Sequence, residues 1–240
     1  MSVSERRSAA RSAVVWTQLE SALAGAGARE VLDIGGGTGG FAVRVASLGH
    51  RVTVVDPSPD ALASLGRRAR EEDVDVVGVQ GDLSTLDDLV EPGSVDVVLC
   101  HGVLEVVPDP VRALGAVARA LREGGTLSVV VAQRHAAVVA RAMAGHFDQA
   151  RELLDGDPSR GESGRSHHRF TAQEVTDLLR EAGFDVGPVH AVRVFADLVP
   201  GALVDLEPGA GAALAELEKA VATRPEYLPL ATQVHVLATR

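Results

Sequence analysis

The residues best suited to chemistry begin in a glycine-rich stretch, VLDIGGGTGG at 31–40. An apolar run leads directly into these glycines, and glycine is entropically costly inside regular structure. A turn without side chains lets the main chain approach a ligand closely. The spacing Gly35-x-Gly37-x-x-Gly40 matches the fingerprint of dinucleotide-binding proteins, in which this turn contacts a pyrophosphate.

The acid that precedes the glycines supports a second interpretation of the same turn. The spacing Asp33-x-Gly35-x-Gly37-x-Gly39 resembles the loop of class I S-adenosylmethionine (SAM) methyltransferases. A carboxylate at Asp33 would repel a pyrophosphate across a cleft of low dielectric constant. SAM has no phosphate, and an acid can interact with its ammonium and sulfonium groups. Asp33 therefore favours SAM as the cofactor and S-adenosylhomocysteine as the product, with a nicotinamide dinucleotide as the alternative.

Three further polar positions follow later apolar runs. Asp56 ends the second run and is expected to accept both ribose hydroxyls, a role that also fits a dinucleotide. Asp82 lies where class I enzymes contact the adenine amino group, and His101 follows the fourth run. Ligands of open α/β sheets bind at the carboxyl ends of the strands. Each of these side chains can also be a simple turn or helix cap.

The apolar segments predict the elements that position these residues. Short Val-rich segments without strict alternation are typical of strands buried on both faces of a sheet. They lie at 30–34, 51–56, 74–82, 95–101 and 126–132. Helical patterns separate them at 39–49, 60–72 and 109–125, the last between Asp109-Pro110 and Gly124-Gly125. This alternation predicts a parallel sheet with right-handed crossovers.

The pattern changes after residue 132. A helix is expected at 135–155, and a loop rich in Gly, Pro and Ser follows it. Thr171 and Glu174 have the spacing of a capping box at the start of the next helix. The remaining expected elements are a strand at 184–199, a helix at about 208–224, a strand at 230–240 and an N-terminal helix at 5–24.

With the resemblance of the glycine loop to that of class I methyltransferases, these patterns imply a Rossmann-like class I methyltransferase fold. Its seven-stranded, mostly parallel sheet carries helices on both faces, with an N-terminal helix and a cap of helix and loop. We expect one domain over 1–240. Its segments are the N-terminal helix (1–28), the SAM-binding core (29–132), the cap (133–170) and the C-terminal helices and strands (171–240).

Composition limits the classes of function. The chain has 240 residues and a formal net charge of −10, which argues against a sequence-independent nucleic-acid coat. Its single cysteine, Cys100, excludes a disulfide framework and a cysteine zinc site, and no spacing suggests another metal site. No apolar run is long enough to span a membrane, and no signal-type apolar core follows the basic N-terminus. A cytoplasmic protein without membrane contact is expected.

Beyond the glycine loop, the chain resembles a narrower family. It is similar to the bacterial tRNA 5-carboxymethoxyuridine methyltransferases, which esterify a carboxylate on the wobble uridine. The resemblance extends from about residue 9 to 240. It is carried by RSAVVW, VLDIGGGTGG, HGVLEVVPDP, VARAMAGHFD, AVRVFADL, ELEKA and the C-terminal LATQVHVLATR.

The resemblance also implies roles for individual residues. It implies that Arg11 contacts the SAM carboxylate. Arg193 is expected to pair with the substrate carboxylate, on the chemistry of a guanidinium as much as on the resemblance. The alternative is that Arg193 is an ordinary exposed arginine on a strand. The cofactor site is expected to consist of Arg11, Asp33, Gly35, Gly36, Gly37, Gly39, Asp56, Gly81, Asp82 and His101. Arg193 and His101 are the candidate catalytic residues.

The implied tRNA partner requires basic groups. Arg160, Arg165 and Arg169, with the N-terminal arm, are expected to contact phosphates. The same loop contains Asp157 and Glu162, which departs from the lysine-rich loop of the family. A solvated lid is the other explanation of this loop.

Direct transfer of the SAM methyl group to a carboxylate requires no general base, because the acceptor is already ionised at pH 7. A phenol or amine acceptor would need one, with His101, His135 and His146 as candidates. Three alternatives to tRNA methylation stay open at this point. They are methylation of a small metabolite, NAD-linked oxidoreduction, and SAM binding without catalysis.

Overall fold

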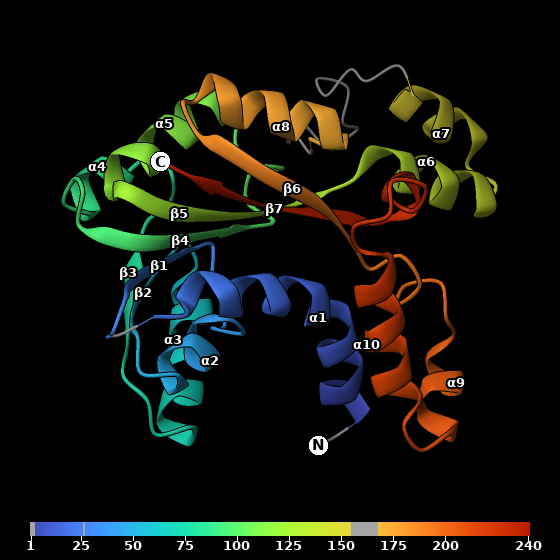
Figure 1. Ribbon diagram of the computed structural model, residues 1–240, viewed down its shortest axis with the longest axis horizontal. Coiled ribbons are helices and arrows are strands. Elements are labelled where there is room, and N and C mark those ends of the chain that lie inside the picture. The colour runs from blue at the N-terminus through green and yellow to red at the C-terminus, as the bar shows by residue number, and fades with distance from the viewer. Residues whose placement is uncertain (1–2, 26, 155–167) are drawn as a thin grey trace. The chain divides into compact units, whose positions relative to one another are not determined.

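The computed structural model describes residues 3–25, 27–154 and 168–240 (Figure 1). The chain divides into two compact units. The glycine-loop unit comprises Ala22–Val129, Thr176–Gly187 and Leu237–Arg240. The arginine unit comprises Met1–Ser21, Val130–Val175 and Pro188–Val236. In the described ranges, no helix combines the length and the apolar character that crossing a membrane requires.

Seven strands form one mostly parallel sheet in the order β3-β2-β1-β4-β5-β7-β6. They are β1 (Glu30–Ile34), β2 (Arg51–Asp56), β3 (Val76–Gln80), β4 (Val95–His101), β5 (Leu121–Ala132), β6 (Asp185–Val192) and β7 (Gln233–Thr239). All seven were expected from the apolar segments, and β1, β2 and β4 have the predicted bounds. The predicted fold class is confirmed.

The sheet register brings the ends of neighbouring strands together. β1 pairs in parallel with β2 and with β4, so Ile34 lies beside Val55 and Cys100. The residues that follow Ile34, Val55 and Cys100 therefore lie at the same edge of the sheet. β2 also pairs in parallel with β3. The central strands are buried, as their Val-rich sequences predict, and side chains such as Leu32, Val54 and Leu99 are fully inaccessible.

Helices flank this sheet. They are α1 (Val3–Leu23), α2 (Ala42–Ser47), α3 (Pro59–Glu71), α4 (Leu86–Leu89), α5 (Pro110–Ala120), α6 (Arg134–Met143), α7 (Phe147–Leu154), α8 (Ala172–Glu181), α9 (Gly201–Leu206) and α10 (Ala210–Val221), with a 3₁₀ turn η2 (Leu228–Leu230). Within the glycine-loop unit, α2 and α3 lie on one side of the strands, and α4 and α5 lie on the other (Figure 1). The short helices α4 and α9 were not predicted, because a helix of one or two turns has too few residues to show a period.

Two predicted helix starts are confirmed by their caps. The Asp109 carboxylate accepts the backbone N–H of Arg112 at 3.0 Å, and Pro110 follows at the first helical position. Thr171 and Glu174 form a reciprocal capping box. The Glu174 N–H donates to the Thr171 hydroxyl at 3.2 Å, and the Thr171 N–H donates to the Glu174 carboxylate at 2.7 Å.

The predicted helix at 109–125 is too long. α5 ends at Ala120, and Leu121 is already extended at the start of β5. The Gly124 N–H donates to the Arg240 carbonyl, and the Arg240 N–H donates to the Gly125 carbonyl, each at 3.0 Å. The two glycines therefore belong to a strand that pairs with the C-terminal end of the chain. Local sequence could not show this partner.

Two more predicted elements differ from the structure. The helix at 135–155 is divided into α6 and α7, and Gly145 between them has a φ of 79°. This left-handed conformation ends α6, since only glycine adopts it without strain. The strand at 184–199 ends at Val192, because Arg193 also has a positive φ, of 62°. The expected segments of a single domain stay a prediction, and the two compact units divide the chain at other points.

Candidate active site

The glycine turn lies directly after β1 in the glycine-loop unit. The Gly35 N–H donates to the Val55 carbonyl of β2 at 2.7 Å, which fixes the start of the turn against the neighbouring strand. Gly35 has a φ of 67°, a conformation that favours glycine. At Gly36, an added Cβ would lie 2.5 Å from a carboxylate oxygen of Asp33. The turn therefore needs glycine at Gly35 for its conformation and at Gly36 for close packing on the acid.

Asp56, the last residue of β2, connects this turn to the next strand. Its Oδ2 accepts the Gly37 N–H at 2.9 Å, and its Oδ1 accepts the Ser58 N–H at 2.9 Å. The side chain is buried. A carboxylate oxygen has more than one acceptor site, so each oxygen can still bind a ligand hydroxyl. Asp56 therefore shapes the turn and retains capacity for a ribose.

Asp33 is buried beneath the same turn. Burial, and then the nearby charge of Asp56, raise the pKa of Asp33 to about 7. Without a positive charge beside it, this carboxyl group therefore takes up a proton near neutral pH. A cation brought next to Asp33 would favour its ionised form.

A cavity of about 580 Å³ opens beside the turn, and its walls include Gly35, Asp56, Asp82, Leu83, Val103 and Val106. The Asp82 Oδ1 accepts the N–H and the hydroxyl of Ser84 at 2.8 and 2.6 Å, and these hydrogen bonds lower the pKa of Asp82. Gly81 precedes it, and its N–H donates to the Asp56 carbonyl. A Cβ at Gly81 would come within 2.4 Å of Leu89. The cavity wall therefore combines acids, Asp56 and Asp82 among them, with apolar side chains.

His101 ends β4, and its neighbour Gly102 lines the cavity. The His101 Nε2 lies 2.8 Å from the Ser128 hydroxyl, and the Phe41 ring packs edge-on against the imidazole at a centroid distance of 4.8 Å. Burial lowers the pKa of His101 to about 3. The imidazole is therefore neutral at pH 7 and a weak general base.

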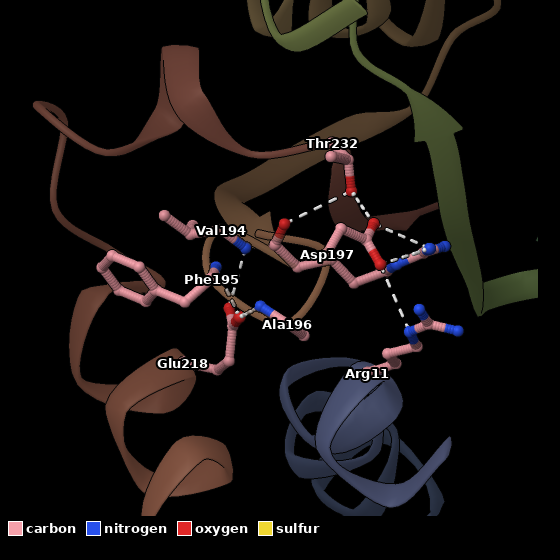
Figure 2. A network of polar contacts seen from close by, with 8 residues as sticks. Arg11, Val194, Phe195, Ala196, Asp197, Glu218 and Thr232 are labelled. Carbon is pink, nitrogen blue, oxygen red and sulfur yellow. Dashed lines mark hydrogen bonds and ion pairs between the residues drawn. The ribbon is translucent and has the colours of Figure 1, made fainter. Parts of the chain in front are cut away.

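The arginine unit contains a second group of charged and polar residues, the arginine cluster, which consists of Arg11, Arg193, Asp197 and Thr232. Figure 2 shows Arg11 and Thr232 against the Asp197 carboxylate. The Arg193 Nη2 lies 2.8 and 2.7 Å from the two carboxylate oxygens of Asp197. The Arg11 Nε lies 3.2 Å from Oδ1 of the same carboxylate, and the Thr232 hydroxyl donates to Oδ2 at 2.9 Å. One carboxylate thus holds two guanidinium groups and a hydroxyl.

A second carboxylate holds the backbone of the segment that carries Arg193 and Asp197. Glu218 of α10 is completely buried. Its Oε2 accepts the Val194 N–H at 2.9 Å, and its Oε1 accepts the N–H groups of Phe195 and Ala196 at 2.8 and 2.7 Å (Figure 2). Buried charges are stable when hydrogen bonds replace their water shell. Three consecutive backbone donors supply that shell here.

Of the three arginines expected to bind phosphates, Arg169 is described. Its carbonyl accepts a hydrogen bond from the Arg134 side chain at 3.0 Å. Arg160 and Arg165 lie outside the described residues. No cluster of three or more His, Cys, Asp or Glu side chains in the described ranges could hold a metal ion.

Comparison with known proteins connects this geometry to a family. A family model described as a methyltransferase domain matches residues 32–129. The tRNA 5-carboxymethoxyuridine methyltransferase of Escherichia coli K12 is 31% identical over 238 residues, which cover 96% of this chain and 88% of that protein. The chain belongs to the SAM-dependent methyltransferases. Membership decides between the two interpretations of the glycine turn, in favour of SAM and against a dinucleotide.

Other relatives extend the comparison. The ubiquinone biosynthesis O-methyltransferase of Xanthomonas euvesicatoria is 35% identical over 174 residues, covering 70% of this methyltransferase and 66% of that protein. The crystal structure of an S-adenosylmethionine dependent methyltransferase from Mesorhizobium loti matches with a TM-score of 0.63 and 21% identity, over 95% of this chain and 98% of that chain. The fold is therefore that of known SAM-dependent methyltransferases, while the two named relatives differ in their acceptors.

The cavity of the methyltransferase fits its cofactor. The acids Asp56 and Asp82 are hydrogen-bond acceptors for hydroxyl and amino groups, and apolar walls such as Leu83 and Val103 suit an adenine ring. A cation placed next to Asp33 would lower the raised pKa of this group. SAM supplies an activated methyl group when it is bound. The individual roles expected of these residues stay predictions.

Sequence reasoning found the positions around the cavity and missed two carboxylates of the methyltransferase. Asp197 lies in the quoted AVRVFADL motif, but nothing local distinguishes it from an ordinary surface acid. Glu218 had a recognisable signal, because it lies between Leu214 and Val221 on the i, i+4, i+7 stripe with which a helix faces the protein core. Arg11, expected at the cofactor, pairs with Asp197 in the arginine unit.

Proposed function

We propose that the methyltransferase esterifies a carboxylate, and that its acceptor is the carboxymethoxy group of a wobble uridine in tRNA. The observation that carries this proposal is the whole-length likeness to the E. coli tRNA 5-carboxymethoxyuridine methyltransferase. The likeness includes the region that contains Arg193 and Asp197, beyond the residues matched by the methyltransferase domain model.

The cofactor would be held mainly by residues at the strand ends. Asp56 accepts the ribose hydroxyls, and the Gly81-Asp82 pair binds the adenine. The glycine turn, with Gly35, Gly36, Gly37 and Gly39, allows close approach of the main chain, and Asp33 balances positive charge. By resemblance, Arg11 binds the cofactor carboxylate and His101 lies against the cofactor as a neutral group.

The acceptor carboxylate needs alignment and no deprotonation. Arg193 has a planar guanidinium that suits a carboxylate, and its side chain is 28% exposed, so a ligand can reach it. Holding two reacting groups in line supplies about 7–11 kcal/mol of barrier reduction in favourable cases. The very low basicity of His101 is compatible with this chemistry, because an ionised acceptor needs no general base.

Recognition of tRNA would use Arg160, Arg165 and Arg169 with the N-terminal arm. Contacts from arginine to phosphate fix the position of an RNA without reading its sequence. The net charge of −10 requires that such contacts be local.

A small-metabolite acceptor is the second candidate. The ubiquinone biosynthesis O-methyltransferase of Xanthomonas euvesicatoria favours it, since that relative is slightly more identical over the shorter matched region. The acidic composition favours it too, because it opposes RNA binding. In that case residues 133–170 would form the cap over a small acceptor.

The test uses radiolabelled SAM with separated RNA and metabolite fractions from the protein's own cells. We expect label in tRNA, and we expect mild alkali to release it as methanol, because methyl esters hydrolyse under conditions that leave ether and amine methyl groups intact. Label that enters only the metabolite fraction would select the second candidate. Alkali-stable label would reject a carboxylate acceptor.

A further inference from the structure

We propose that Asp197 is a positioning residue that presets the Arg193 guanidinium for the acceptor carboxylate, on a segment that Glu218 holds in shape. This inference rests on the proposed function, in which Arg193 binds that carboxylate. It gives a role in acceptor binding to the buried Glu218 and the partly buried Asp197, which lie outside the glycine-loop unit. All the residues concerned belong to the arginine unit.

The backbone of the segment 193–197 is curved around the Glu218 carboxylate. The segment 193–197 follows β6, and Arg193 at its start has a φ of 62°. This conformation is unfavourable for any residue that carries a Cβ atom. The following N–H groups of Val194, Phe195 and Ala196 converge on the Glu218 carboxylate. Consecutive donors converge only when the chain curves around the anion. Glu218 therefore selects a curved backbone that this sequence would not otherwise favour.

Two side chains on this curved segment, Arg193 and Asp197, form an ion pair. Because the backbone is curved, Arg193 and Asp197 meet, and the Arg193 Nη2 reaches both oxygens of the carboxylate. The Thr232 hydroxyl donates to the Asp197 Oδ2 at 2.9 Å, and the Thr232 N–H donates to the Arg193 carbonyl at 3.5 Å. Thr232 thus binds both residues from a different segment. The guanidinium is fixed in orientation before any acceptor arrives.

The arginine cluster has more positive than negative charge. Arg11 and Arg193 together carry two positive charges, and Asp197 supplies one negative charge at contact distance from both. The cluster therefore keeps a net positive charge, which attracts anions. The side chains of Arg11 and Arg193 are 50% and 28% exposed, against 19% for Asp197. A carboxylate from solvent therefore has access to the two arginine side chains, while Asp197, which orients them, is more buried.

The donors of Arg193 are also incompletely used. Its Nε is buried and has no hydrogen-bond partner within the described residues. A guanidinium has five N–H donors, and Asp197 contacts only Nη2. In a purely structural ion pair, we would expect the carboxylate to accept hydrogen bonds from two different guanidinium nitrogens. The geometry leaves donor capacity for a second carboxylate.

The test is a double-mutant cycle on Asp197→Asn and Arg193→Ala, with tRNA that carries unmethylated carboxymethoxyuridine as the acceptor. We expect each single variant to raise the acceptor KM by about tenfold or more, since small misplacements of a binding group have large effects. We expect the double variant to resemble Arg193→Ala alone, because Asp197 acts through Arg193. Additive losses in the double variant would overturn the proposal.

The controls separate this inference from the proposed function. Asp177→Asn removes an aspartate from a surface pair with Arg180 and should leave the acceptor KM unchanged. If Arg193→Ala leaves the acceptor KM unchanged, the proposed carboxylate recognition fails. If Arg193→Ala raises it and Asp197→Asn does not, only the positioning role fails.

A second measurement needs no acceptor. In a protein with ¹⁵N-labelled arginine side chains, the Nε–H signal of Arg193 is identified by its loss in Arg193→Lys. We expect this signal to be sharp in the parent protein, and to broaden or exchange faster with water in Asp197→Asn and Glu218→Gln. Glu216→Gln on the exposed side of the same helix is the matched control. An unchanged Arg193 signal in both test variants would show that neither acid presets the guanidinium.

Discussion

At the scale of residues, the chemistry of the proposed cofactor site depends on where each acid is buried. Asp33 lies in β1, Asp56 ends β2 and Asp82 follows β3, and the surroundings of the three acids differ. Asp82 is stabilised in its ionised form by Ser84, whereas burial disfavours ionisation of Asp33. Asp56 accepts two backbone N–H groups and thereby shapes the glycine turn. Three identical side chains are therefore suited to three different interactions.

The raised pKa of Asp33 predicts that cofactor binding depends on pH. Its pKa is about 7 in the folded protein without ligand, and a bound cation would lower it. Binding then releases a proton, so the affinity for SAM should increase by about tenfold from pH 6 to pH 8 and level off above. Calorimetry in buffers of different ionisation enthalpy measures both the affinity and the proton release. In Asp33→Asn this pH dependence should be lost.

The same group predicts the opposite effect on stability. The pKa of Asp33 is raised from 3.8 when unfolded to about 7 when folded. Its contribution to stability is therefore fully present below pH 4 and is lost as the pH rises towards 7. We expect Asp33→Asn to be more stable than the parent protein at pH 8 in urea unfolding, although it binds SAM more weakly. A less stable variant at pH 8 would contradict the burial of an unfavourable charge.

Asp56→Ala is expected to weaken cofactor binding. The substitution removes the acceptor of the Gly37 N–H and the proposed ribose contact, and an unpaired buried polar group costs about 1–3 kcal/mol. This corresponds to a dissociation constant for S-adenosylhomocysteine that rises by roughly 5- to 150-fold. Asp60→Asn, an exposed acid on α3, is the control. An unchanged dissociation constant in Asp56→Ala would remove the ribose role.

At the scale of elements, local signals account for the starts of helices better than for their ends. The Asp109 and Thr171 caps lie where the sequence predicts them, because a cap involves residues only two or three positions apart. The end of α5 depends instead on the pairing of Gly124 and Gly125 with Arg240. The break between α6 and α7 occurs at a single glycine that a continuous helix would also tolerate at some cost.

The capping box of α8 gives a prediction at this scale. Thr171→Ala removes the acceptor of the Glu174 N–H and should lower the free energy of unfolding by about 1 kcal/mol. For a protein of this size the melting temperature should fall by about 2–4 °C. Differential scanning calorimetry measures the change, with the exposed Thr223→Ala as the control. Equal melting temperatures for the two variants would show that the cap does not stabilise α8.

At the scale of the whole molecule, charge is the property that bears on the acceptor. A net charge of −10 opposes association with any polyanion at long range. A tRNA acceptor therefore requires a local basic surface, and the candidate arginines for it are few. A small acceptor requires no such surface. Salt distinguishes these possibilities, since phosphate contacts release counterions.

We expect the affinity for bulk tRNA to fall by about 10- to 50-fold between 50 and 200 mM salt, as roughly three phosphate contacts would produce. Arg160→Ala combined with Arg165→Ala should reduce this salt dependence without changing the affinity for S-adenosylhomocysteine. Filter binding or fluorescence anisotropy measures the effect. Binding of tRNA that is weak and insensitive to salt would favour a small-metabolite acceptor.

The sequence by itself determined the sheet, the glycine turn and the acids at the strand ends. These features depend on residue types within a few positions, and a parallel sheet aligns the carboxyl ends of its strands without further information. Asp33, Asp56 and Asp82 could therefore be placed near one another from the strand pattern alone. Asp33 favoured SAM over a dinucleotide, and membership of the SAM-dependent methyltransferases decided between them.

Only the tertiary structure decided which charges meet and how strongly burial changes them. Arg11 and Arg193 both contact the Asp197 carboxylate. Glu218 accepts hydrogen bonds from three consecutive N–H groups that begin at Val194. The partners in these contacts come from distant segments of the chain. The low pKa of His101 and the high pKa of Asp33 arise from burial that no local pattern measures. The physical reason is that periodicity reports which face of an element is buried, whereas contacts and desolvation depend on what the rest of the chain places against that face.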